Sequence, residues 1–152
     1  MPLNQSQHNH VDINLRVVTA CPAANANVNS ASIDTRGGST AQPVTASQTV
    51  DQLGSSAREL MELRARVDAG ANLVATDLIT IKVQDSDDNA AFADVAKLAA
   101  QTVAGIVGNG NAQTDLRWPI PSDMRRYVRI NIAVANGAGD VTAQNVTLDL
   151  LT

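Results

Sequence analysis

The chain has 152 residues and a net charge of −4, and its only aromatic residues are Phe92, Trp118 and Tyr127. The length suits one domain, and the acidic balance gives no electrostatic basis for direct binding of nucleic acid. Apolar residues make up 44% of the chain, but with so few rings the core has to be aliphatic, which favours a thin sandwich over a deep ligand pocket.

The first ten residues are polar and predict a flexible N-terminal arm over residues 1–10. They lack the basic and apolar regions of a secretory signal, and nowhere does an apolar run approach the roughly 20 residues that span a bilayer. Residues 11–19 (VDINLRVVT) then alternate between apolar and polar side chains, which predicts a half-buried strand. Its expected inward face consists of Val11, Ile13, Leu15 and Val17. A single β-sandwich domain is predicted over residues 11–152.

Residues 21–56 are rich in Ala, Asn, Ser, Thr, Gln and Gly and poor in large apolar side chains. Such a composition cannot build a core alone. We therefore expect extended connections and a second arm here, with a short strand such as ASIDT (31–35) inside it.

Two further strands are predicted by alternation. Around residues 61–67, Met61, Leu63, Ala65 and Val67 alternate with charged residues, although Glu, Leu, Met and Arg are also good helix formers. In residues 77–84 (DLITIKVQ), Ile79, Ile81 and Val83 are expected to face inward.

The alternation of apolar and polar residues stops in residues 89–107. Apolar residues here recur at spacings of three and four, and alanine is frequent, which indicates a helix. Asp87, Asp88 or Asn89 are candidate caps. We expect one short helix followed by an irregular strand, while helix and strand both stay open for the segment as a whole.

The C-terminal stretch contains the clearest strands. Val128, Ile130, Ile132 and Val134 share one face, and Val146, Leu148 and Leu150 supply a returning face. Between them, Asn136-Gly137 is a strong hairpin signal. Strands with one apolar face along the whole chain predict an all-β fold, an antiparallel jelly-roll-like β-sandwich with extended polar arms and loops.

Residues for catalysis or for a metal are hard to find. His8 and His10 lie in the polar arm without a cluster of cysteines or carboxylates around them, and Cys21 has no basic neighbour to activate it. The stretch DSDDNA (85–90) resembles the start of a calcium loop, but alanine stands where the loop needs glycine and glutamate. We read it as a polar turn that caps a helix. No catalytic, cofactor-binding or metal-binding residue is predicted, and no cofactor.

An arginine–aromatic cluster is the best candidate site. Arg125, Arg126 and Arg129 flank Tyr127, and Trp118 lies just upstream, a composition typical of protein-interface hot spots. The alternative is that Tyr127 covers a sheet edge while the arginines pair with Asp115 or Asp123. Val11 and Ile13, in the strand after the arm, complete the candidate interface.

The order DLITIKVQDSDDNAAFADV, a glycine-rich stretch, IPSDMRRYVRINIAV and a final VTLDL strand resembles the capsid cement (decoration) proteins of tailed bacteriophages. The resemblance covers roughly residues 60–152. It implies a jelly roll on the outer surface of the virion head that bridges major capsid proteins and pairs as a homodimer or another homo-oligomer, with assembly in the host cytoplasm and without contact to nucleic acid or membrane. A carbohydrate- or receptor-binding jelly roll on the virion is the alternative function.

Overall fold

The computed structural model describes residues 11–35 and 61–151, and over residues 11–15 it describes the backbone alone. These residues form strands and no helix, so none of them could cross a membrane as a helix. The strands are β1 (Val11–Ala20), β2 (Asn27–Asn29), β3 (Ile33–Asp34), β4 (Glu62–Val67), β5 (Leu78–Ser86), β6 (Ala93–Asp94), β7 (Gln101–Ala104), β8 (Thr114–Pro119), β9 (Tyr127–Val134) and β10 (Asn145–Leu151).

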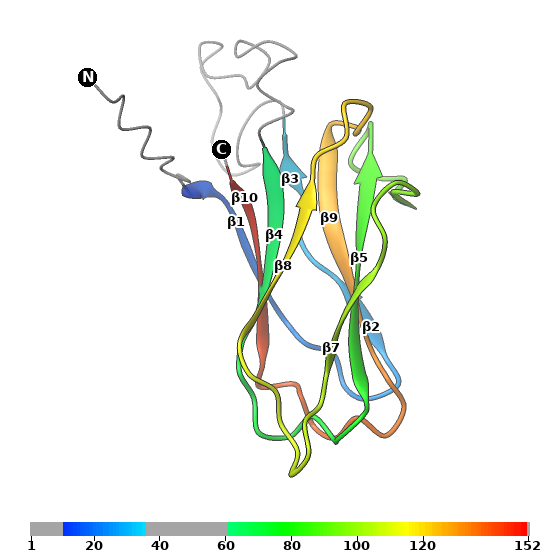
Figure 1. Ribbon diagram of the computed structural model, residues 1–152. Coiled ribbons are helices and arrows are strands. Elements are labelled where there is room, and N and C mark those ends of the chain that lie inside the picture. The colour runs from blue at the N-terminus through cyan, green and yellow to red at the C-terminus, as the bar shows by residue number, and fades with distance from the viewer. Residues whose placement is uncertain (1–10, 36–60, 152) are drawn as a thin grey trace, which may run out of the picture.

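Two antiparallel sheets face each other as a sandwich (Figure 1). One has the order β1-β10-β4-β8, and the other has the order β2-β9-β5-β6, with β3 also on β9 and β7 also on β5. The β2 and β3 strands pair with opposite ends of β9, and β6 and β7 pair with opposite ends of β5. Each couple is therefore one interrupted edge strand.

Counted in this way the sandwich has eight strands, lettered A to H along the chain, in the sheet orders A-H-C-F and B-G-D-E. Strands A and H pair in the first sheet, B and G in the second, C and F in the first, and D and E in the second. Pairs taken in this nested order therefore alternate between the two sheets, as in two Greek keys, and this is the jelly-roll arrangement. The predicted all-β jelly-roll sandwich is thus confirmed.

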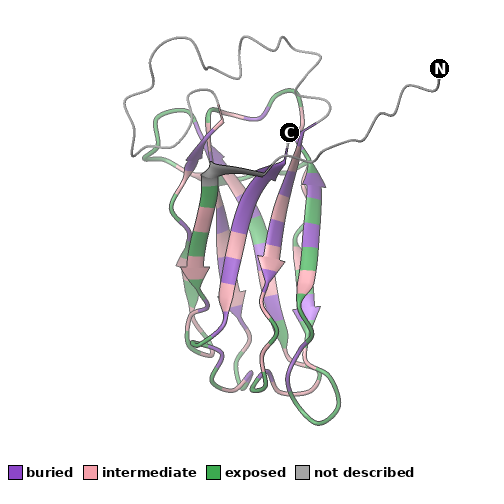
Figure 2. Ribbon diagram, turned by 90° about the vertical axis from the view of Figure 1, so that its left-hand side faces the viewer, coloured by how far each residue is buried: buried purple, intermediate pink, exposed green. Residues whose placement is uncertain are grey.

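The core lies between the sheets and is aliphatic, as the composition requires. Figure 2 shows buried residues alternating with less buried ones along the strands. Along β9 every second residue is buried, and β4 and most of β5 repeat the pattern. The fully buried large side chains are Ile33, Leu63, Leu73, Ile79, Ile81, Ile130, Ile132, Leu148, Leu150, Val67, Val83 and Val128. At about 1.5–3 kcal/mol for each buried aliphatic side chain, this layer supplies the main stabilisation. The inward faces predicted for β4, β5, β9 and β10 are confirmed.

The predicted short helix within residues 89–107 is wrong. Residues 93–94 and 101–104 pair with opposite ends of β5, so this segment forms β6 and β7. Val103 is buried, but Ile106, which the helical spacing placed on the same face, is 57% exposed. Sheet pairing outweighs the local helix propensity of the alanines, as tertiary context commonly does.

The predicted C-terminal hairpin is also wrong. The β9 strand pairs within the β2-β9-β5 sheet, whereas β10 lies between β1 and β4 in the other sheet. Residues 135–144 therefore cross from one sheet to the other, and Ala138 and Val141 are buried in this crossing. Gly137 and Gly139 both have positive φ, so the Asn-Gly signal marks a turn in a longer connection.

The N-terminal third is a mixture of outcomes. A strand does form at Val11–Ala20, and its pairing with β10 shifts register between Val11 and Arg16. Of the predicted inward face, Val17 packs against the core, and the side chains of residues 11–15 lie outside the described part of the chain. Within residues 21–56, β2 and β3 belong to the sandwich itself, and Ile33 from the ASIDT stretch is in the core. The arm predicted over residues 1–10 and the connections over 36–56 lie outside the described residues.

Candidate protein interface

Four of the predicted interface residues come together at one end of the sandwich. Arg125 and Arg126 lie in the loop before β9, and Tyr127 and Arg129 lie at the start of β9 itself. Trp118 does not join them: it is 3% exposed in the core, and its indole Nε1 donates to the Ala99 carbonyl at 2.9 Å. Its prediction as an interface residue is wrong. The side chains of Val11 and Ile13 lie outside the described part of the chain.

Arg125 forms an ion pair with Asp85 at one end of the core. Alternation along β5 puts Asp85 on the inward face after Val83, where its side chain is 7% exposed. Arg125 binds this carboxylate twice: its backbone N–H donates to Oδ2 at 3.0 Å, and its Nε lies 3.1 Å from Oδ1. A buried carboxylate requires such partners, so this pair fixes the loop to the sheet.

Arg126 connects β9 to the edge strand β3. Its guanidinium donates to both oxygens of Asp34 at 2.8–3.1 Å, and the Asp34 side chain is 9% exposed. Its carbonyl accepts from the backbone and the hydroxyl of Thr35. The guanidinium also lies 5.0 Å from the centroid of the Tyr127 ring. The side chain is therefore held from several directions.

Arg129 lies on the outer face of the same sheet. Its guanidinium stacks on Phe92 at 3.9 Å from the ring centroid, and its Nε donates to Gln84 at 2.9 Å. Burial lowers the pKa of Arg129 from its ordinary value. Gln84 in turn donates to Asp94, which Lys82 also approaches at 3.1 Å, and these two hydrogen bonds lower the pKa of Asp94. The result is a connected polar layer across β9, β5 and β6.

The arginines do not take the carboxylates that the sequence suggested. Asp115 is paired with Arg66 at 3.0 Å on the other sheet, and Asp123 accepts from Lys97 at 2.6 Å. Arg125 and Arg126 use Asp85 and Asp34 instead, residues 40 and 92 positions away in the chain. Such long-range pairs carry no local sequence signal.

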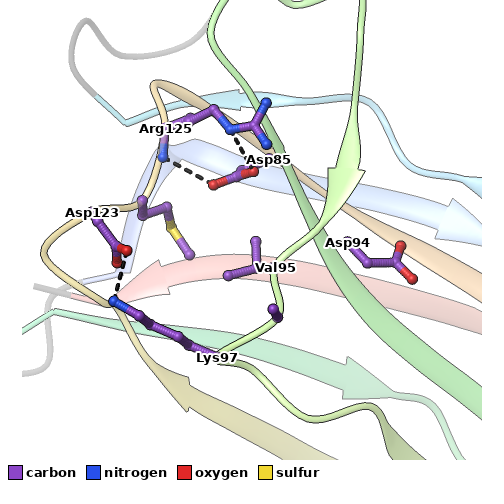
Figure 3. Close-up of a pocket in the computed structure, with 8 residues that line it drawn as sticks. Asp85, Asp94, Val95, Lys97, Asp123 and Arg125 are labelled. Atoms are coloured by element: carbon purple, nitrogen blue, oxygen red, sulfur yellow. Dashed lines mark hydrogen bonds and ion pairs between the residues drawn. The ribbon is translucent and has the colours of Figure 1, made fainter.

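A pocket of about 280 Å³ lies beside this cluster (Figure 3). It is lined by Asp85, Asp94, Val95, Ala96, Lys97, Asp123, Met124 and Arg125. Its carboxylates already have cationic partners: Asp85 has Arg125, Asp123 has Lys97 and Asp94 has Lys82. The hydrogen bond from Lys97 also lowers the pKa of Asp123. The pocket therefore presents paired charges around Val95 and Met124, which suits contact with a complementary surface more than proton transfer.

The acidic turn after β5 is held together by hydrogen bonds to one of its own carboxylates. Asp88 accepts hydrogen bonds from the backbone of Ala90 and Ala91 and from the Ser86 hydroxyl, and these bonds lower its pKa to about 2. It caps a turn that leads into β6, so the expected role as a helix cap is wrong. Across residues 11–35 and 61–151, His, Cys, Asp and Glu side chains nowhere gather in a group of three or more suited to a metal ion.

The sequence interpretation missed an ion-pair stripe on the outer face of the β1-β10-β4-β8 sheet. At its centre Asp149 lies between Arg16 and Arg64, and farther along Arg66 pairs with Asp115. The alternation of Glu62, Arg64 and Arg66 predicted their outward direction, but nothing in the sequence connects them to Asp149.

The fold and its clusters define a jelly-roll protein whose polar groups are organised on surfaces and sheet ends. Comparison with known families gives the particular one: the model of the family described as Bbp16 matches residues 16–149, which is 134 of the 152 residues. The chain belongs to the Bbp16 family. No curated protein matches it.

Proposed function

We propose that this protein is a structural component of a phage virion that binds the outside of the head, bridges neighbouring major capsid proteins and stabilises the mature shell. One observation carries the proposal. The segments that resemble capsid cement proteins form β5 and β9, at the centre of one sheet, and β10, inside the other. The resemblance therefore covers the framework of the molecule.

The framework has the mechanical properties that a bridging protein needs. An aliphatic core between two hydrogen-bonded sheets makes a stiff body, and the pairs Arg125–Asp85 and Arg126–Asp34 fix one end of it. A stiff partner loses little conformational entropy on docking, whereas each backbone residue that orders on binding costs about 1–2 kcal/mol. Rigid contacts of modest strength then suffice.

Multivalency supplies the remaining stability. Once one copy has bound one shell subunit, its contact with a neighbouring subunit forms at a high effective concentration. A homodimer would double the contacts again. A shell covered by such bridges resists internal pressure although each bridge alone is weak.

The alternative, a carbohydrate- or receptor-binding module, has less support in the geometry. Carbohydrate sites use open aromatic faces, but Arg129 stacks on Phe92, and Arg126 lies over Tyr127. The third ring, Trp118, is in the core. An aromatic platform is therefore absent from the described surface.

Heads purified without this protein provide the test. They should release DNA at a lower temperature than complete heads, and addition of the purified protein should restore the higher temperature. Unchanged head stability together with reduced adsorption to host cells would favour the receptor-binding alternative. Deletion of residues 1–10 should lower the occupancy of the heads without unfolding the sandwich.

A further inference from the structure

Four connections lie together at the end of the sandwich opposite the Arg125–Asp85 pair (Figure 1). These distal loops are residues 21–26, 68–77, 105–113 and 135–144. They contain Asp68, Asp77 and Asp140 and no lysine, arginine or histidine. Most of their other residues are glycine, alanine and asparagine.

The loop 105–113 ends in an exposed apolar tip. Ile106 is 57% exposed and Val107 is 97% exposed. Of the other large apolar side chains exposed in the described residues, Val18 lies apart on β1, whereas Leu78, at the start of β5, pairs with Ala104 beside this loop. Single exposed apolar residues are ordinary, but two in succession at a protruding turn form a compact apolar surface.

Hydrogen bonds hold the tip in one conformation. The Asn109 N–H donates to the Ile106 carbonyl at 3.0 Å, and the Ile106 N–H donates to the Gly110 carbonyl at 2.9 Å. Gly108 has φ +93°, as the third residue of a type II turn requires, and an added Cβ there would meet no atom within 4 Å. The turn is tight but faces open space.

The base of the tip is fixed to the neighbouring loop 68–77. Gly110 N–H donates to the Leu73 carbonyl at 2.7 Å, and Gly105 N–H donates to the Asp77 carbonyl at 2.9 Å. Leu73 is fully buried beneath these bonds. The tip is therefore pre-organised, and a partner that binds it avoids much of the ordering cost that a loose loop would impose.

We propose that Ile106 and Val107 dock into an apolar socket with a basic rim on the shell protein to which this protein binds. The inference rests on the proposed function. The partner's charge follows from complementarity, because the distal loops carry carboxylates and no cations, and opposite charge around an apolar contact favours association. The same charge disfavours insertion into an anionic membrane, since interfacial segments are usually basic there.

The test measures binding to purified heads that lack this protein, as a function of its concentration. The double variant Ile106→Ser/Val107→Ser should need at least tenfold more protein for half-occupancy, because it loses most of the apolar contact. The matched control is Val18→Ser, which removes an exposed valine from a strand and should bind like the wild type. Both variants should unfold at the same denaturant concentration as the wild type, since none of the three substituted residues is buried.

The outcomes separate the two proposals. If the wild type fails to bind, the proposed function is overturned. If the wild type and the double variant bind equally well, the function stands and the docking inference is overturned. If the wild type sediments as a dimer and the double variant as a monomer, the tip binds a second copy of this chain. If the wild type binds phosphatidylglycerol vesicles and the double variant does not, the tip binds lipid. Either result would overturn the shell-protein assignment.

The basic rim is tested separately. Asp140→Asn keeps an acceptor for the Thr142 N–H but removes the charge. It should weaken binding severalfold and reduce its salt dependence. An unchanged salt dependence would contradict the basic rim.

Discussion

Arg64 and Asp149 lie opposite each other in the β4–β10 ladder, and Arg64 Nη2 donates to Asp149 Oδ2 at 2.5 Å. From the other side Arg16 Nε donates to Oδ1 at 2.7 Å. Although Asp149 projects from the outer face of a sheet, its side chain is only 1% exposed. Two arginines thus share one buried carboxylate across three strands.

Removal of this carboxylate should be costly. Asp149→Ala leaves the guanidinium of Arg64, whose side chain is 11% exposed, without its close partner, and only Asp115 remains, at 3.9 Å. Breaking a buried ion pair from one side typically costs about 3–5 kcal/mol, and we expect the lower end because Arg16 can reach water. Denaturant unfolding followed by circular dichroism measures the loss.

The matched control is Asp115→Ala in the same ion-pair stripe. Asp115 and Arg66 are both about one third exposed, so solvent screens their interaction. The free energy of unfolding should fall by no more than about 1 kcal/mol. Equal losses for the two variants would mean that burial of Asp149 does not determine its contribution.

Trp118 offers a second prediction, because it is the only tryptophan in the chain and lies in the core. Its native emission should be blue-shifted, resist quenching by iodide and shift to the red on unfolding. The emission should also stay unchanged on binding to heads. Strong quenching by iodide in the native protein would show that Trp118 is exposed, as its prediction as an interface residue requires.

A part of the fold could be predicted where its signal depends only on residues that are close together in the sequence. The alternation of Ile79, Ile81 and Val83 depends only on neighbouring residues and correctly gave the strand and its inward face. Continued by two residues it also places Asp85 inward, and the same step from Leu116 places Trp118 in the core. Alternation alone therefore also predicts that Asp85 and Trp118 are buried.

The errors arose where pairing over long distances decides the structure. The Asn136-Gly137 turn is the same whether the next strand returns to its own sheet or crosses to the other. Alanines near residue 99 favour a helix locally, but the segments on either side of them pair with the edge of β5. The partners of Arg125 and Arg126 are likewise set by topology, so only the type of cluster could be predicted.

A third prediction concerns Gly105. An added Cβ at this position would lie 2.1 Å from the Val74 carbonyl oxygen, which belongs to the backbone and cannot move aside easily. Gly105→Ala should therefore destabilise the protein by about 3 kcal/mol through overpacking. Gly108→Ala, in open space, should cost only about 1 kcal/mol for its positive φ. Thermal unfolding of both variants measures the difference, and a larger loss for Gly108→Ala would contradict the packing of the distal loops.

A fourth prediction concerns the single cysteine. Burial, with a smaller contribution from Asp68, raises the pKa of Cys21 from 9.0 to about 11. The thiolate fraction at pH 8 is then about a hundredfold lower than for a free thiol, and the thiolate is the reactive form. A disulfide reagent such as DTNB should react at least that much more slowly with the native protein than with the unfolded chain. Rapid native labelling would show that the Cys21 site opens readily.

The last prediction is a pH dependence that originates at Asp88. Hydrogen bonds from Ala91, Ala90 and Ser86 lower its pKa from 3.8 to about 2 in the folded protein. Because the folded pKa lies below the unfolded one, the unfolded state takes up the proton first as the pH falls. The stabilisation from Asp88 is therefore complete above about pH 4 and is lost as the pH falls through about 2.

Asp88→Asn separates this contribution from those of other carboxylates. Asparagine keeps an acceptor for the backbone N–H groups of Ala90 and Ala91 but does not titrate, so the turn persists while its pH dependence disappears. Unfolding free energies at pH 5 and pH 2.5 should differ less in the variant than in the wild type. An identical difference in the two proteins, or an Asp88 carboxyl that titrates near pH 4 by NMR, would show that the turn does not bind the ionised carboxylate in preference to the protonated one.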